Sequence, residues 1–81
     1  MDSGIEIKTI GSSANAWGAM KNYLDSTSGK KGVTCMVVDN TLSENINDKE
    51  LIESARILAG DYPDVKSIRL LLKSGNYLTI K

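Results

Sequence analysis

Histidine is absent from the 81 residues of this sequence, and cysteine occurs only once. Without histidine, the chain cannot form a Ser-His-Asp or Cys-His catalytic site, or a zinc site that needs imidazole ligands. One cysteine cannot form a disulfide within the chain, so oxidation does not stabilise the fold. Long apolar runs are also absent, since none approaches the ~18 residues of a membrane-spanning helix.

Net charge is missing as well, because ten Lys and Arg balance ten Asp and Glu. A neutral chain has no overall field that would attract nucleic acid or an anionic membrane. What is present is an ordinary globular composition, with 41% apolar and 25% charged residues, which argues against disorder. We therefore expect one small domain spanning residues 1–81. The polar start from Met1 to Gly4 does not resemble a signal peptide, so we expect a cytoplasmic protein.

Two segments in the first forty residues have the pattern of β-strands. Residues 5–10 alternate apolar and polar side chains, which predicts a half-buried strand with Glu6 and Lys8 on its solvent face. Residues 33–38 are apolar at almost every position, which predicts a central strand covered on both sides or nearly so. Cys35, inside this second strand, is expected to be a buried small hydrophobe rather than a reactive thiol.

Two helices are expected, one after each of these strands. Ser12 or Ser13 can cap the first, whose apolar stripe includes Trp17 as a core anchor. The second has a clearer start, because Asn47 can cap it and Glu50 completes a capping box. Its predicted buried stripe consists of Leu51, Ile52, Ala55, Leu58 and Ala59.

The last segment has the pattern of a β-hairpin. Strands over residues 65–73 and 77–81 flank a loop that we expect to occupy residues 74–76. This register gathers the apolar side chains on one inner face, whereas a two-residue turn would scatter them over both faces. The expected pairs are Leu72 with Leu78 and Leu70 with Ile80.

The element order is therefore βαβαββ, an α/β chain that we expect to fold as a two-layer α+β sandwich. Because strand–helix–strand crossovers are right-handed, the first three strands should be parallel and the fourth antiparallel. The four-stranded mixed sheet then carries both helices mainly on one face. Its other face should be largely open.

This order is similar to that of the C-terminal domain of translation initiation factor 3, of Alba-type chromatin proteins and of TusA-like sulfur carriers. The sulfur carriers open their first helix with Cys-Pro-x-Pro, where this chain has Ser13-Ala14-Asn15-Ala16. The other two families are strongly basic, whereas this chain is neutral. The resemblance therefore extends to topology alone and assigns no residue and no activity.

The outer face of the hairpin is the preferred candidate site. Strand alternation places basic, aromatic and apolar side chains there, a mixture that suits a protein–protein interface. We therefore predict a non-catalytic interaction domain that binds a protein partner or itself through this open sheet face, with no cofactor and no metal. The expected partner-binding residues are Arg69, Leu71, Lys73, Tyr77 and Lys81.

Two other functions stay open. The same basic and aromatic side chains can hold RNA or single-stranded nucleic acid, although zero net charge disfavours this ligand. A metal-dependent nuclease or hydrolase would use Glu6, Lys8 and Asp39, since Glu6 and Lys8 have the spacing of an ExK element. Such a site needs a second carboxylate, and Asp2 is the only acid that precedes Glu6. Asp39 is more readily interpreted as a turn former.

Charge is unevenly distributed along the chain although it sums to zero. Residues 41–64 carry six acids against two bases, whereas residues 65–81 carry four bases and no acid. An acidic helix and a basic hairpin on one small body favour head-to-tail association, in which the charges set orientation and rate. We expect weak, salt-sensitive self-association or partner binding, with Leu71 and Tyr77 supplying the affinity.

Overall fold

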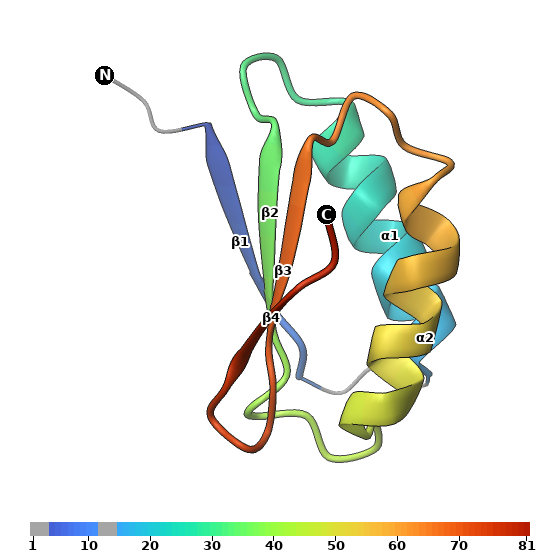
Figure 1. Ribbon diagram of the computed structural model, residues 1–81, viewed down its shortest axis with the longest axis vertical. Coiled ribbons are helices and arrows are strands. Elements are labelled where there is room, and N and C mark those ends of the chain that lie inside the picture. Colours follow the sequence, from blue (N-terminus) through green and yellow to red (C-terminus); the bar gives the residue numbers. More distant parts are fainter. Residues whose placement is uncertain (1–3, 12–14) are drawn as a thin grey trace.

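The chain folds into a β-sheet with a helical layer packed on one side (Figure 1). The structure, a computed structural model, describes residues 4–11 and 15–81. Within them the elements follow the predicted order βαβαββ. They are β1 (Ile5–Thr9), α1 (Ala16–Ser28), β2 (Cys35–Asp39), α2 (Asp48–Ala59), β3 (Ser67–Leu71) and β4 (Tyr77–Thr79).

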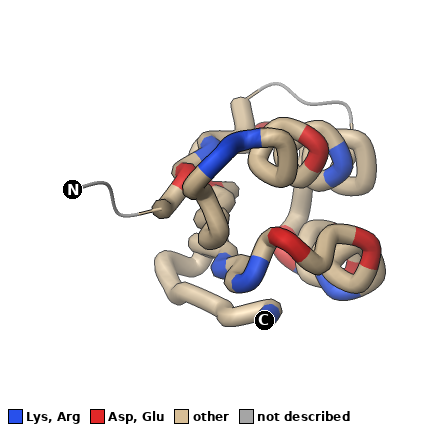
Figure 2. The backbone as a smooth tube through the Cα atoms, turned by 90° about the horizontal axis from the view of Figure 1, so that it is seen from above, with Lys and Arg blue, Asp and Glu red and all other residues tan. Residues whose placement is uncertain are grey.

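The four strands lie in the sheet in chain order, β1-β2-β3-β4. β1 and β3 both pair with β2 in parallel, while β4 pairs with β3 antiparallel, which confirms the predicted mixed sheet. Two right-handed crossovers that step in the same direction leave both helices on the same face of a sheet. Seen end on, α1 and α2 lie together on one side of the strands (Figure 2).

Side chains between the sheet and the helices form the core. Alternate residues of β2 and β3 point into it, and the helices add the apolar stripes that face the sheet. Its largest fully buried members include Met20, Leu24, Met36, Val38, Leu51, Ile68 and Leu70. Among the described residues, neither helix combines the length and the apolar character that a membrane crossing requires.

The two helices differ in how well the sequence locates their starts. Asn15 caps α1, and its Oδ1 accepts a hydrogen bond from the Gly18 amide at 2.6 Å. The predicted caps Ser12 and Ser13 lie outside the described residues. α2 begins after Asn47, as predicted.

Asn47 and Glu50 bond to each other at the cap of α2, and Glu50 accepts from the side-chain amide of Asn47 rather than from the backbone N–H that a capping box uses. Oδ1 of Asn47 accepts a hydrogen bond from the Glu50 amide at 2.8 Å, and its Nδ2 donates to Glu50 Oε1 at 2.7 Å. Ile46 and Leu51, on either side of this cap, are both buried in the core. Local side chains therefore fix where α2 begins.

The hairpin has the predicted faces but a different register. Leu71 pairs with Tyr77, which shifts the pairing by two residues from the expected one. The loop occupies residues 73–75 rather than 74–76. Gly75 has a φ of 92°, a left-handed conformation that only glycine adopts without steric cost, and it closes the three-residue turn. Because the shift is even, the side chains within β3 and β4 keep their predicted faces, whereas Lys73 and Lys81 lie outside these strands.

Candidate interaction face of the sheet

The sheet face away from the helices, called the open face, is the candidate site. Residues in register lie side by side on one face, so strand pairing decides which side chains this face holds. Val38 and Leu70, fully buried beneath the helices, define the opposite face. The open face holds Ile5, Ile7 and Thr9 of β1, Cys35, Val37 and Asp39 of β2, Ser67, Arg69 and Leu71 of β3, and Tyr77 and Thr79 of β4.

Apolar and aromatic side chains are exposed on the open face. Ile7 is 67% exposed and lies beside the half-buried Val37. Tyr77 is 65% exposed and lies beside Leu71. Arg69, also exposed, is the β3 neighbour of Val37. The open face therefore carries two apolar pairs, Ile7 with Val37 and Leu71 with Tyr77, and Arg69 and Asp39 lie between them. Grouped apolar side chains indicate an interaction site more strongly than isolated ones do.

The prediction that Glu6 and Lys8 face solvent on the outer side of the sheet is wrong. In the pairing of β1 with β2, Glu6 lies beside Met36 and Lys8 beside Val38, and both partners are fully buried. The two charged side chains therefore lie on the helix side of the sheet. Ile10, two positions after Lys8, is fully buried and fixes this orientation of β1.

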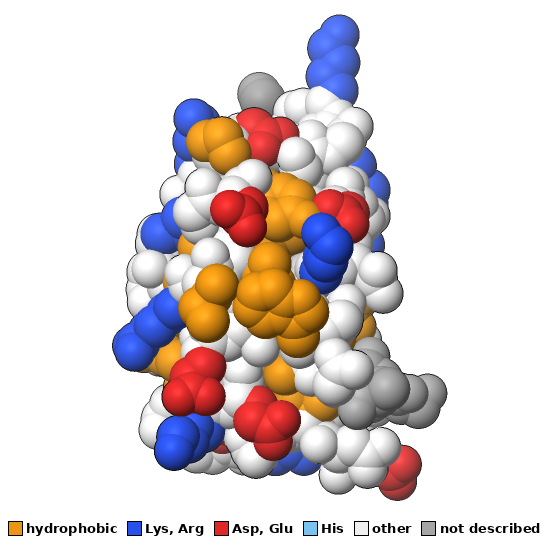
Figure 3. Space-filling model, turned by 90° about the vertical axis from the view of Figure 1, so that its right-hand side faces the viewer, with side chains coloured by type: hydrophobic (Ala, Val, Ile, Leu, Met, Phe, Trp, Pro, Cys, Tyr) orange, Lys and Arg blue, Asp and Glu red, His pale blue; other side chains and the backbone are white. Residues whose placement is uncertain are grey.

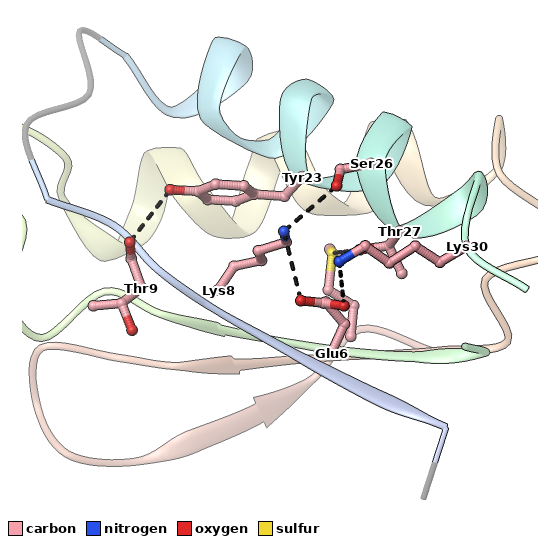
Figure 4. A network of polar contacts seen from close by, with 8 residues as sticks. Glu6, Lys8, Thr9, Tyr23, Ser26, Thr27 and Lys30 are labelled. Carbon is pink, nitrogen blue, oxygen red and sulfur yellow. Dashed lines mark hydrogen bonds and ion pairs between the residues drawn. The ribbon is translucent and has the colours of Figure 1, made fainter. Parts of the chain in front are cut away.

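A charged network occupies the helix side of β1 (Figure 4). Glu6 accepts a hydrogen bond from Lys30 at 2.6 Å and forms a longer ion pair with Lys8 at 3.6 Å. Lys8 also donates to Ser26 Oγ of α1 at 3.5 Å. The hydrogen bond from Lys30, together with the charges of Lys30 and Lys8, lowers the pKa of Glu6. Polar contacts therefore tie this strand to α1 and to the loop that follows it.

Three of the five predicted partner-binding residues share the open face. Arg69, Leu71 and Tyr77 lie together on β3 and β4. Lys73 lies in the hairpin loop and Lys81 lies beyond β4, and the side chains of both turn toward the helical layer. The structure thus separates the aromatic and apolar part of the predicted site from two of its cations.

Both of these lysines bind backbone carbonyls of their own chain. The ammonium of Lys73 donates to the Ser43 carbonyl in the loop before α2. The ammonium of Lys81 donates to the carbonyls of Ala59 at 2.7 Å and Tyr62 at 3.1 Å. Carbonyls at a helix C-terminus lack intrahelical partners, so Lys81 stabilises the end of α2.

Sequence reasoning missed the β1 and β2 part of the open face. The alternation in β1 predicts that Ile5 and Ile7 face the core, yet they lie on the open face with Val37. Cys35, predicted to be buried, is partly exposed on the same face. The usable signal was Ile10, because it cannot share a face with Ile5 and Ile7 in a regular strand.

The residues of the predicted metal-dependent site are not brought together. Asp39 belongs to the open face, whereas Glu6 lies on the helix side. Oδ1 of Asp39 accepts hydrogen bonds from the Thr41 hydroxyl at 2.6 Å and the Thr41 amide at 2.8 Å, and both lower the pKa of Asp39. This geometry confirms Asp39 as a turn former. Asp2 lies outside the described residues, which contain neither a pocket nor a group of three side chains able to hold a metal ion.

Asn40 organises the loop at this end of the sheet. Its buried side chain donates to the Ile46 carbonyl at 3.1 Å and to the Asp48 carboxylate at 2.9 Å. Its Oδ1 accepts a hydrogen bond from the Ser43 hydroxyl at 2.5 Å. Asp48 also accepts a hydrogen bond from the Lys73 amide at 3.0 Å. The buried amide of Asn40 therefore holds the loop before α2, and the Asp48 carboxylate connects this amide to the hairpin.

The helical layer carries a second group of exposed apolar side chains. Ile57 is 64% exposed and Trp17 is 45% exposed, so the prediction of Trp17 as a core anchor is wrong. Trp17 follows the buried Ala16 by about 100° around the helix, which turns its ring away from the sheet. Hydrophobic side chains run down the middle of this layer with acidic and basic side chains around them (Figure 3).

Comparison of the chain with known protein families, with curated proteins and with solved structures found no match. The chemistry of the open face is therefore the basis for a functional proposal.

Proposed function

We propose that this domain is a non-catalytic interaction module whose open face binds another protein. The observation that carries the proposal is Ile7, an aliphatic side chain that is 67% exposed in the middle of a regular strand. A partner that covers this surface gains about 25 cal/mol for each Å² of apolar area removed from water. Leu71 and Tyr77 form the second apolar pair of this face, and Arg69 adds a guanidinium. Aromatic residues and Arg are enriched at the centres of protein interfaces.

A protein ligand is favoured over single-stranded nucleic acid. Within the part of the chain that the structure describes, Arg69 is the one Lys or Arg that strand alternation puts on the open face. Lys73 and Lys81 direct their ammonium groups at carbonyls of their own chain. Affinity for nucleic acid rests largely on neutralised phosphates, so one cation beside one Tyr77 ring supplies little of it.

The proposal needs no cofactor and no metal. A cytoplasmic setting is part of it, because a single cysteine provides no disulfide within the chain to suit an oxidising compartment. Self-association through the same face is the alternative form of the proposal.

The test compares two isoleucines of nearly equal exposure on opposite layers. Ile7→Ser removes apolar surface from the open face, while Ile57→Ser removes it from the helical layer. The tagged wild type and both variants are used to capture proteins from cells that express the native chain, and each captured protein is quantified. We expect a partner whose recovery falls about tenfold with Ile7→Ser or Tyr77→Ser and is unchanged with Ile57→Ser.

A second readout uses the thiol on the open face. The captured partner, once purified, should slow the alkylation of Cys35 in the wild type. Loss of capture with Ile57→Ser alone, or unchanged alkylation in the complex, would move the binding surface to the helical layer. Binding of mixed oligonucleotides with a steep dependence on salt would instead assign nucleic acid as the ligand.

A further inference from the structure

β1 is an edge strand of the sheet (Figure 1). Ile7 is the central residue of this five-residue strand. The even positions bond to β2: the Ile10 amide donates to the Asp39 carbonyl at 2.9 Å, and the Gly4 carbonyl accepts from the Cys35 amide at 3.0 Å. In a strand, the N–H and C=O of one residue point the same way and successive residues alternate. The backbone groups of Ile7 therefore point away from β2, toward the outer edge.

The residues of β1 are complementary to themselves in one antiparallel register. Turning the strand by a two-fold rotation about Ile7 brings Glu6 opposite Lys8 of a second copy, and Lys8 opposite Glu6 of that copy. The outward N–H and C=O of the two Ile7 residues then face each other, as two hydrogen bonds require. Registers displaced by two residues place Glu6 opposite Glu6 or Lys8 opposite Lys8. The charges therefore favour the register about Ile7 over the two registers next to it.

We propose that two copies of this chain pair through antiparallel β1 strands about Ile7 and join their four-stranded sheets into one. This pairing uses a strand edge rather than the open face, so it does not depend on the function proposed above. The contacts between the two copies lie at the middle of β1. Near the end of the strand, the Tyr23 hydroxyl already donates to the Thr9 carbonyl at 3.5 Å (Figure 4). Glu6, Ile7 and Lys8 carry the contact.

Charges on an edge strand ordinarily prevent pairing with another sheet. In the register about Ile7, each of the two cross-strand pairs joins opposite charges instead, and such pairs stabilise an antiparallel ladder. The Lys30 ammonium, 2.6 Å from Glu6, anchors the carboxylate on the helix side of the strand. On the other side, the exposed Ile7 side chains of the two copies become neighbours on the joined open face. Charge and apolar contact thus act together on opposite sides of the same strand pair.

The experiment is sedimentation equilibrium of the full chain over a wide range of concentrations. We expect the wild-type mass to rise from 8.8 kDa toward twice that value. Glu6→Lys and Lys8→Glu each place like charges opposite each other, so each variant alone should dimerise about tenfold more weakly. A mixture of the two variants restores both opposite-charge pairs and should dimerise like the wild type. The double variant Glu6→Lys/Lys8→Glu should do the same.

Three controls make the result decisive. Ile7→Pro removes the outward N–H while leaving the bonds to β2, since proline is tolerated at the edge of a sheet, and it should abolish the dimer. Arg69→Glu leaves β1 intact and should not change the dimer, whereas it should weaken a contact between an acidic helix and the basic hairpin. Circular dichroism confirms that each variant is folded. A wild type that stays monomeric throughout, or a mixture no stronger than its components, would overturn the proposal.

Discussion

Leu70 and Leu71 are consecutive residues of β3 that lie on opposite faces of the sheet. Leu70 pairs with Leu78, next to Val38, and is fully buried beneath the helices. Leu71 pairs with Tyr77 on the open face and is half-buried. One leucine therefore contributes to the core and its neighbour to the candidate interaction surface.

Replacing each leucine separately should show that Leu70 contributes far more to stability than Leu71 does. Leu70→Ala should lower the free energy of unfolding by about 2–5 kcal/mol, because it leaves a cavity in the core. Leu71→Ala should cost about 1 kcal/mol, because its side chain is already partly in water. Urea denaturation measures both values. Equal losses for the two variants would contradict the assignment of faces.

The buried amide of Asn40 should be among the costliest polar groups to remove. Asn40→Ala leaves the Ile46 carbonyl and the Ser43 hydroxyl without this partner, so we expect a loss of about 2–3 kcal/mol in unfolding free energy. Asn45→Ala, at an exposed position of the same loop, is the matched control and should change stability by about 0.5 kcal/mol or less. Thermal or urea unfolding measures both losses. Similar losses for Asn40→Ala and Asn45→Ala would contradict a structural role for the buried amide.

Alkaline titration should report the contact between Tyr62 and Asp25. Tyr62 donates its hydroxyl to the Asp25 carboxylate, and this hydrogen bond raises the pKa of Tyr62 to about 12. The hydrogen bond stabilises the folded state, and its whole contribution is present when the pH is below 10.0, the pKa of Tyr62 in the unfolded chain. That contribution is lost as the pH rises through about 12. Asp25→Asn should return the pKa of Tyr62 toward 10.0.

Tyrosinate absorbance follows this titration, and Tyr62→Phe identifies which of the three tyrosines is responsible. If Asp25→Asn leaves the highest tyrosine transition where it was, the hydrogen bond does not govern the pKa of Tyr62.

Acid should weaken the fold partly through Glu6. Its pKa is lowered below the ordinary value of 4.5 by the hydrogen bond from Lys30, so its carboxylate stabilises the folded state above that pH. This contribution is lost as pH falls below 4.5 through the lowered pKa. Glu6→Gln should therefore flatten the acid limb of a plot of unfolding free energy against pH. Glu53→Gln, an exposed change on α2, serves as the control, and the same flattening in both variants would contradict a special role for Glu6.

The topology could be predicted from the sequence because its signals are local. The cap at Asn47 and the glycine of the hairpin loop each act within a few residues. The handedness of crossovers then leaves few ways to arrange the strands. The loop was still misplaced by one residue, since the left-handed conformation of Gly75 decides the turn and a hydrophobic pattern does not reveal it.

Only part of the candidate site could be predicted, because the positions of its side chains depend on residues that are distant in the sequence. Alternation in β1 predicts the wrong inner face, because the buried Ile10 and the register that sets Glu6 beside Met36 place the charged positions on the helix side. The helix-side position of two charges also depends on Lys30, which is distant in sequence. The direction of Lys81 depends likewise on the end of α2, which no pattern within the hairpin encodes.

The match between strand order and chain order bears on how the protein folds as it is made. Each described strand after β1 pairs with the strand that precedes it in the chain. Each new strand can therefore pair with a strand that is already in the chain, as the domain folds. The two parallel pairings each require a helical crossover, whereas the last hairpin closes only a short loop. The two crossover pairings are thus the slow steps of folding, and the β3–β4 ladder completes the sheet quickly once β3 is in place.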